Sequence, residues 1–134
     1  MTLPVALDTN VLVRLLVNDD PAQAELAAAC IDASAGCFVP ITVALELEWV
    51  LRGAYKLPRE GVITAFEGLL AIRHLHLEQE ELVRRALDWH RQGMDFADAL
   101  HLARSEGCGA MVSFDQKLAQ MAGQLNLQPR VESP

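Results

Sequence analysis

Aromatic residues are scarce in this chain, and long apolar runs are missing. Phe, Trp and Tyr make up 5% of the 134 residues although 51% are hydrophobic, so a core must consist chiefly of Leu, Val, Ala and Ile. No apolar run reaches the roughly 18 residues that suggest a membrane-spanning helix. The first residues lack a basic segment ahead of an apolar one, so we expect no secretory signal. The length predicts a single domain over residues 1–134.

Cysteines are few, and their spacing matches neither a disulfide framework nor a metal site. Cys30, Cys37 and Cys108 form no Cys-x-x-Cys motif and no Cys/His cluster at metal-ligand spacing. An odd number of thiols without an export signal indicates reduced cysteines in the cytoplasm. We expect all three to be small buried hydrophobes.

Basic residues are outnumbered by acidic ones, 11 Lys and Arg against 18 Asp and Glu, and the formal net charge is −7. This balance argues mildly against a nucleic-acid partner, because phosphate binding usually needs a basic surface. The argument weakens if several acids share a metal site, where bound cations offset them. Six basic residues also fall in segments near the acids discussed below: Arg14, Arg52, Lys56, Arg59, Arg104 and Lys117.

Short apolar runs alternate with helical patterns along the chain. Strands are expected at residues 5–7, 37–39, 73–77, 110–112 and 127–131. Helices are expected at residues 10–17, 22–33, 42–52, 59–72, 80–91, 96–106 and 116–122. Strands that alternate with helices predict βα units and a parallel sheet, and therefore the α/β class.

Four acids stand where an apolar run gives way to a helical pattern, namely Asp8, Glu46, Asp98 and Asp115. In an open α/β sheet, ligands bind at the carboxyl ends of the parallel strands. Carboxylates gathered there repel one another unless a cation joins them, and oxygen-ligated divalent ions are the usual solution. This placement predicts a metal-dependent enzyme.

Helix capping offers a structural alternative for each of these acids. Asp95 and Asp115 fit N-cap positions, and Asp98 fits an acid in a first helical turn. Asp8 is harder to explain in this way, because Thr9 alone could cap the following helix.

Glu46 lies in the apolar stretch Val43-Ala-Leu-Glu-Leu47, on the side of its helix that we expect to pack against the sheet. A buried carboxylate without a partner is costly, so Glu46 needs one. Glu48 lies on a different face of the same helix. Which of the two points inward is open from the residues alone.

In these residues the chain resembles PIN-domain nucleases, and most closely the VapC-type toxins of toxin–antitoxin pairs. The resemblance covers essentially the whole chain and rests on four blocks in order, Leu7-Asp-Thr-Asn-Val-Leu12, Val43-Ala-Leu-Glu-Leu-Glu-Trp-Val-Leu51, Asp95-Phe-Ala-Asp-Ala-Leu-His-Leu-Ala103 and Val112-Ser-Phe-Asp115. It implies a three-layer α/β/α sandwich with a short parallel sheet of about five strands.

The resemblance also implies roles for individual residues. The family's acidic metal-site positions fall on Asp8, Glu46, Asp98 and Asp115. Asn10 and Ser113 match neighbouring polar positions, and Ser113 keeps a hydroxyl where the family pattern usually has Thr. Asp95 is interpreted first as a helix cap and second as an outer acid of the metal site. The block pattern favours Glu46 over Glu48 as the functional acid.

The activity implied by the resemblance is hydrolysis of RNA with Mg²⁺ or Mn²⁺ in the cytoplasm. One or two such ions lower the pKa of a bound water and neutralise charge at the scissile phosphate. A homodimer and an inhibitory small antitoxin are the implied protein partners. Arg14 and Lys117 are candidates for contacts with the RNA backbone, with solvated surface charge as the alternative. His101 is expected to be a packing residue at a partly buried helix edge.

Three other functions compete with this interpretation. A housekeeping PIN-type RNA-processing nuclease would use the same acids. A catalytically silent PIN module that binds RNA or protein would have no reason to keep four repelling carboxylates. A receiver-type phosphoacceptor domain wants its first acids paired, and it assigns no role to Glu46.

Overall fold

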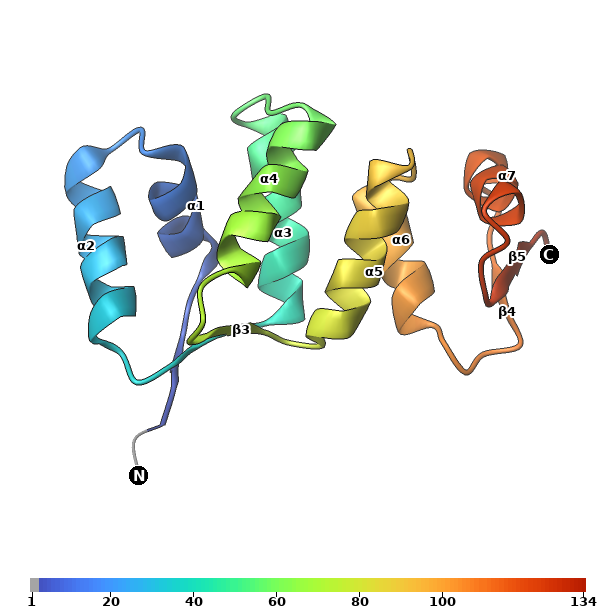
Figure 1. Cartoon of the computed structure of the whole chain (residues 1–134). Helices are drawn as coiled ribbons and strands as arrows, with labels where there is room; N and C mark the ends of the chain where they lie inside the picture. Colours follow the sequence, from blue (N-terminus) through green and yellow to red (C-terminus); the bar gives the residue numbers. More distant parts are fainter. Residues whose placement is uncertain (1–2) are drawn as a thin grey trace. The chain divides into compact units, whose positions relative to one another are not determined.

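The structure is a computed structural model that describes residues 3–134, and it divides into two compact units. The first unit is Met1–Glu80 and the second is Glu81–Pro134. Figure 1 traces the elements of both units along the chain.

The first unit is built around a parallel sheet of three strands in the order β1-β2-β3. The strands are β1 (Val5–Ala6), β2 (Cys37–Val39) and β3 (Leu75–Leu77). In the register of the sheet, Cys37 of the central strand pairs with Val5 on one side and Leu75 on the other. Parallel neighbours need crossover connections, and helices supply them here.

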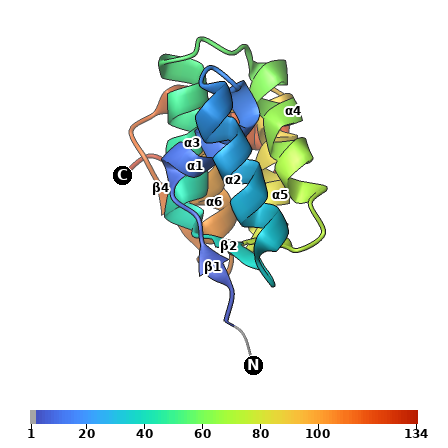
Figure 2. The ribbon, with the colours of Figure 1, turned by 90° about the vertical axis from the view of Figure 1, so that its left-hand side faces the viewer.

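Two helices form each crossover of the first unit. The helices are α1 (Thr9–Val17), α2 (Pro21–Ala33), α3 (Ile41–Gly53) and α4 (Arg59–Leu70). Helix α1 packs against α2 and α3, and α3 packs against α4. Figure 2 shows α1 and α2 lying side by side where β1 leads into α1. The core between these elements is aliphatic apart from one ring, and its fully buried side chains include Leu12, Val39, Leu47, Leu51 and Phe66.

Local sequence signals explain where these helices begin and end. Asp20 caps α2 by accepting a hydrogen bond from the Gln23 amide at 3.1 Å, and Pro21 occupies the first helical position. Asn18 ends α1 in the left-handed conformation with φ of 57°, which Asn tolerates better than most residues. The abrupt turn between α1 and α2 follows from these residues.

The second unit contains three helices and a two-stranded parallel sheet. The elements are α5 (Glu80–Arg91), α6 (Phe96–Arg104), β4 (Ala110–Val112), α7 (Gln116–Gln124) and β5 (Arg130–Glu132). Met111 pairs with Val131 in the sheet, and α7 forms the crossover and packs on β5. His90 is buried, with its Nδ1 atom 2.7 Å from the Met94 carbonyl oxygen and its ring edge-on to Phe96. This contact joins the end of α5 to the start of α6.

The α/β class expected from the sequence is confirmed, with seven helices alternating with five short parallel strands in residues 3–134. The strands pair as a sheet of three and a sheet of two. That residues 1–134 form one domain stays a prediction. No helix within residues 3–134 has the length and apolar character needed to cross a membrane.

The expectation for the cysteines is only partly right. All three thiols are free, and Cys37 is buried in the central strand, as expected. Cys30 and Cys108 are exposed, so the prediction that they are buried hydrophobes was wrong. Cys30 lies on an exposed position of α2, and Cys108 lies in the loop before β4, where neither meets a core.

Candidate active site

Asp8 stands at the junction of β1 and α1. The chain leaves the sheet after the buried Leu7, and the exposed Asp8 then caps α1 by accepting a hydrogen bond from the Thr9 amide at 2.8 Å. The carboxylate therefore lies at the carboxyl end of a parallel strand, which is where the sequence predicted it.

Thr9 connects this junction to α3. Its hydroxyl is largely buried and donates a hydrogen bond to Glu46 Oε1. Asp8, Asn10 and Glu46 line one cavity of about 410 Å³ in the first unit, together with Arg14 and Tyr55. Two of the four predicted acids are therefore brought together.

The expectation that Glu46 packs against the sheet was wrong, because Glu46 is exposed and lines this cavity. The buried acid of α3 is Glu48, which is 2% exposed and accepts a hydrogen bond from Arg52 Nε at 2.8 Å. Ala44, Leu47 and Glu48 lie on the core face of the helix. Residues two apart on a helix point in nearly opposite directions, so Glu46 faces away from that core. The inward position of Glu48 leaves Glu46 available to the cavity.

A second group of carboxylates gathers in the second unit. Asp95, Asp98 and Asp115 line a small cavity of about 50 Å³, and Lys117 contributes to its wall. Asp95 caps α6 by accepting a hydrogen bond from the Asp98 amide at 3.1 Å. Asp98 itself stands in the first turn of that helix, half-buried. The capping expected for Asp95 is thereby confirmed.

Asp115 caps α7 directly after β4. Its carboxylate accepts a hydrogen bond from the Leu118 amide at 3.1 Å, and its own amide donates to Ser113 Oγ at 3.0 Å. The hydroxyl of Ser113 therefore acts on the backbone of Asp115. This fixes the turn that presents the Asp115 carboxylate to the cavity.

The second cavity is electrostatically unfavourable for its own acids. Burial raises the pKa of Asp98, and the negative charges of Asp95 and Asp115 raise it further, while His101 opposes them. Each of these effects disfavours the ionised carboxylate unless a positive charge enters. The cavity therefore favours a proton or a cation at Asp98. His101 is exposed on α6, so the expectation of a partly buried packing residue was wrong.

The donor atoms of the two cavities suit a hard divalent cation. Carboxylate oxygens are the preferred protein ligands of Mg²⁺, which also keeps several waters. Within residues 3–134, no three His, Cys, Asp or Glu side chains lie in an arrangement that would enclose a metal ion as they stand. In the second cavity, Asp95 and Asp115 also accept backbone hydrogen bonds at helix starts. The ligand chemistry fits, and the residues available for it are the carboxylates of these two cavities.

Three residues near the predicted acids were missed by sequence reasoning. The sequence indicates a helix-capping role for Thr9, and its position next to Asp8 is the one local signal for a role in the site. Asp19 and Tyr55 hydrogen-bond to each other across 36 residues of chain. No local pattern in the sequence could have associated these two.

A comparison with protein families identifies the family of the chain. The family model of the PIN domain matches residues 5–124, so the chain belongs to the PIN domain family. PIN domains are in general metal-dependent nucleases, and the observed helices and short parallel strands are consistent with their α/β/α fold. None of the curated proteins compared with the chain matches it.

Proposed function

We propose that this protein is an endoribonuclease that hydrolyses RNA phosphodiester bonds with Mg²⁺ or Mn²⁺. The observation that carries the proposal is the crowding of acids around Asp98, whose pKa is raised by burial and by Asp95 and Asp115. A cation relieves that repulsion, and a PIN domain supplies the nuclease context. The cavity that holds Asp8 and Glu46 adds two further carboxylates.

In this proposal the candidate metal ligands are the four predicted acids, Asp8 and Glu46 in the cavity of the first unit and Asp98 and Asp115 in the cavity of the second. A bound divalent ion supplies a water of lowered pKa and offsets charge on the scissile phosphate. Thr9 orients Glu46 through its hydroxyl, and Ser113 orients Asp115 through the backbone amide. Asp95 holds the first turn of α6, on which Asp98 stands. Asn10 lines the Asp8 cavity, where its amide can bind a water.

The biological role that we propose is that of the toxin in a toxin–antitoxin pair, acting in the cytoplasm as a homodimer. The resemblance of the four sequence blocks to VapC-type toxins supports this role. The proposed inhibitory partner is a small antitoxin that covers the acids.

The nuclease is tested by incubating purified, antitoxin-free protein with a mixed pool of structured RNA and Mg²⁺ or Mn²⁺. We expect discrete fragments that disappear with a chelator or with Asp8→Asn. Asp20→Asn is a matched control, because it removes the same charge from a helix cap that lines neither cavity. No cleavage, combined with no metal-induced rise in melting temperature, would favour a silent binding module.

The toxin role needs a separate experiment in cells. Induction of the wild-type chain should arrest growth, and Asp98→Asn should not. Co-expression of a small DNA-binding protein encoded beside the gene should relieve the arrest. Cleavage in vitro without any growth arrest would favour the housekeeping nuclease.

A further inference from the structure

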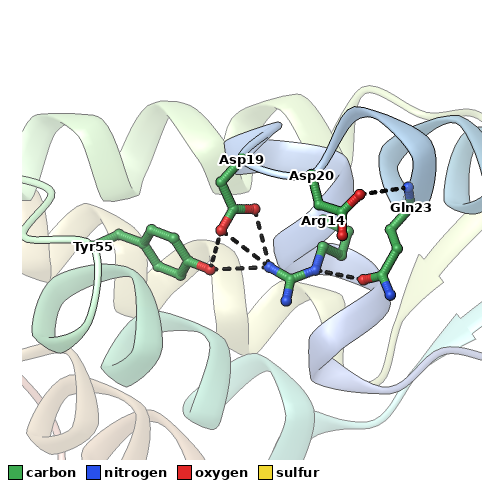
Figure 3. Close-up of polar contacts among 5 residues, drawn as sticks. All are labelled: Arg14, Asp19, Asp20, Gln23 and Tyr55. Atoms are coloured by element: carbon green, nitrogen blue, oxygen red, sulfur yellow. Dashed lines mark hydrogen bonds and ion pairs between the residues drawn. The ribbon is translucent and has the colours of Figure 1, made fainter.

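Arg14 is held in place by three side chains from different parts of the first unit. Its Nη1 atom donates hydrogen bonds to Asp19 Oδ1 at 3.0 Å and to the Tyr55 hydroxyl at 3.1 Å. Its Nε atom donates to Gln23 Oε1 at 2.6 Å. Figure 3 shows the guanidinium between Tyr55 and Gln23, with Asp19 beside it. The partners come from the α1–α2 turn, from α2 and from the segment after α3.

The contacts of Arg14 form a closed ring with Asp19 and Tyr55. The Tyr55 hydroxyl accepts from Arg14 and donates to Asp19 Oδ2 at 2.9 Å. The hydrogen bond from Tyr55 lowers the pKa of Asp19, and Tyr55 and Asp19 raise the pKa of Arg14. Both shifts favour the charged forms of Arg14 and Asp19, and the hydrogen bonds to three partners hold the guanidinium in one orientation.

Stability alone is a weak reason for this arrangement. The side chains of Arg14 and Asp19 are 31% and 40% exposed, and exposed ion pairs contribute little to the free energy of unfolding. Fixing a long Arg side chain also costs conformational entropy. A charged side chain that is already held in one orientation loses less conformational entropy on binding, so this arrangement favours a binding role.

The position of Arg14 indicates what it binds. Arg14 follows Asn10 by one helical turn and lines the same cavity as Asp8 and Glu46. These two carboxylates repel an RNA backbone, and the positive charge of Arg14 beside them opposes that repulsion. In the described part of the chain, Nη2 of Arg14 makes no hydrogen bond, and Figure 3 shows it pointing away from the three partners. A guanidinium edge matches phosphate oxygens in geometry and charge.

We propose that Arg14 binds a backbone phosphate of the RNA close to the scissile bond, and that Asp19 and Tyr55 are the residues that position it. This inference rests on the proposed nuclease function. It assigns phosphate binding in the cavity of the first unit to Arg14, and metal binding to the carboxylates of the same cavity.

The test compares Arg14→Gln with Arg14→Lys and Tyr55→Phe in steady-state cleavage of a short fluorescent RNA of random sequence. Arg14→Gln should raise KM about tenfold, the order expected for one lost charge-assisted hydrogen bond, with kcat nearly unchanged. The salt dependence of log KM should become shallower by about 0.7, the contribution of one phosphate contact in a single strand. Arg14→Lys should keep the wild-type salt slope, and its KM should lie between those of the wild type and Arg14→Gln. Tyr55→Phe should raise KM without changing the salt slope.

Arg91→Gln is the matched control, because it removes the same charge from an exposed pair with Asp88 on α5. It should leave KM and the salt slope unchanged. A purely structural role for Arg14 would lower the melting temperature without changing the salt slope, and that result would overturn the inference. A loss confined to kcat would overturn it as well.

The two proposals fail in different ways. If the wild-type protein neither cleaves RNA nor gains stability with Mn²⁺, the nuclease proposal fails. If the wild-type protein cleaves RNA and Arg14→Gln retains its KM and salt slope, only the phosphate subsite fails. If Arg14→Gln does not fold, Tyr55→Phe decides, and an unchanged KM there would refute the positioning role.

Discussion

Asp95 combines two effects that a pair of substitutions can separate. Its carboxylate caps α6 through the Asp98 amide at 3.1 Å, and its charge contributes to the raised pKa of Asp98. Asp95→Ala removes both the hydrogen bond and the charge. Asp95→Asn removes the charge but keeps an oxygen acceptor, and Asn is a good N-cap. The charge effect is common to both variants, so their difference isolates the cap.

The expected difference in stability between Asp95→Ala and Asp95→Asn follows from the hydrogen bond that the Asp98 amide donates to Asp95. Replacing an N-cap residue by Ala typically lowers the free energy of unfolding by about 1 kcal/mol. Asp95 is exposed, so water can partly replace its carboxylate, and we expect about 0.5–1 kcal/mol between the Ala and Asn variants. For a chain of this size, 1 kcal/mol corresponds to a shift in melting temperature of about 3–5 °C. The free energy of unfolding of Asp95→Asn should equal or exceed that of the wild type, because the substitution relieves the repulsion between Asp95 and Asp98.

The assay is urea unfolding of all three proteins in chelator at neutral pH, combined with an NMR titration of the Asp98 carboxyl carbon. The pKa of Asp98 should move toward its ordinary value in both variants. Equal stability of Asp95→Ala and Asp95→Asn would refute the capping role. An unchanged pKa of Asp98 would refute the electrostatic coupling.

Four further outcomes test the candidate site and the orientation of α3. The folded protein holds the Asp98 proton to higher pH than the unfolded chain does, so the stability of the metal-free protein should fall as pH rises above the ordinary pKa of 3.8. In urea unfolding, the stability of Asp98→Asn relative to the wild type should rise over that pH range. A pH-independent difference between the two proteins would contradict this. Mn²⁺ at one hundred times its dissociation constant should stabilise the wild type by about 2.7 kcal/mol in thermal unfolding, and Asp98→Asn should abolish the gain. Glu48→Ala should lower the free energy of unfolding by about 1–3 kcal/mol, since it empties a buried position and removes the hydrogen bond that Arg52 Nε donates to Glu48. Glu46→Ala should stay within about 0.5 kcal/mol of the wild type and lose RNA cleavage, and a comparable loss of stability in both would contradict the assignment of the cavity acid.

Local signals predicted the order of helices and strands well. The α2 start at Pro21 follows from Asp20 as its cap, and the caps of α6 and α7 follow from Asp95 and Asp115. Such signals act within a few residues, so they are visible in the sequence. Boundaries shifted where no cap marks them, as in β3, which begins at Leu75 instead of residue 73.

The orientation of α3 could not be predicted in the same way. Apolar residues occupy most positions of Ile41–Gly53, so their period does not single out one face. Packing against α1 and α4 selected the face that carries Leu47 and Glu48, and Glu46 was left for the cavity.

The sequence by itself determined the α/β class, the positions of Asp8 and Asp115 after strands and the helix caps, because periodicity and capping depend on near neighbours in the chain. The other two acids, Glu46 and Asp98, stand on helices and not at strand ends. Only the tertiary structure decided which acids share a cavity and how Arg14 is held. The hydrogen bond between Arg14 and Tyr55 spans 41 residues of the chain. The raised pKa of Asp98 depends partly on Asp115, which caps a different helix. Burial and charge act through space, so these properties exist only once the chain has folded.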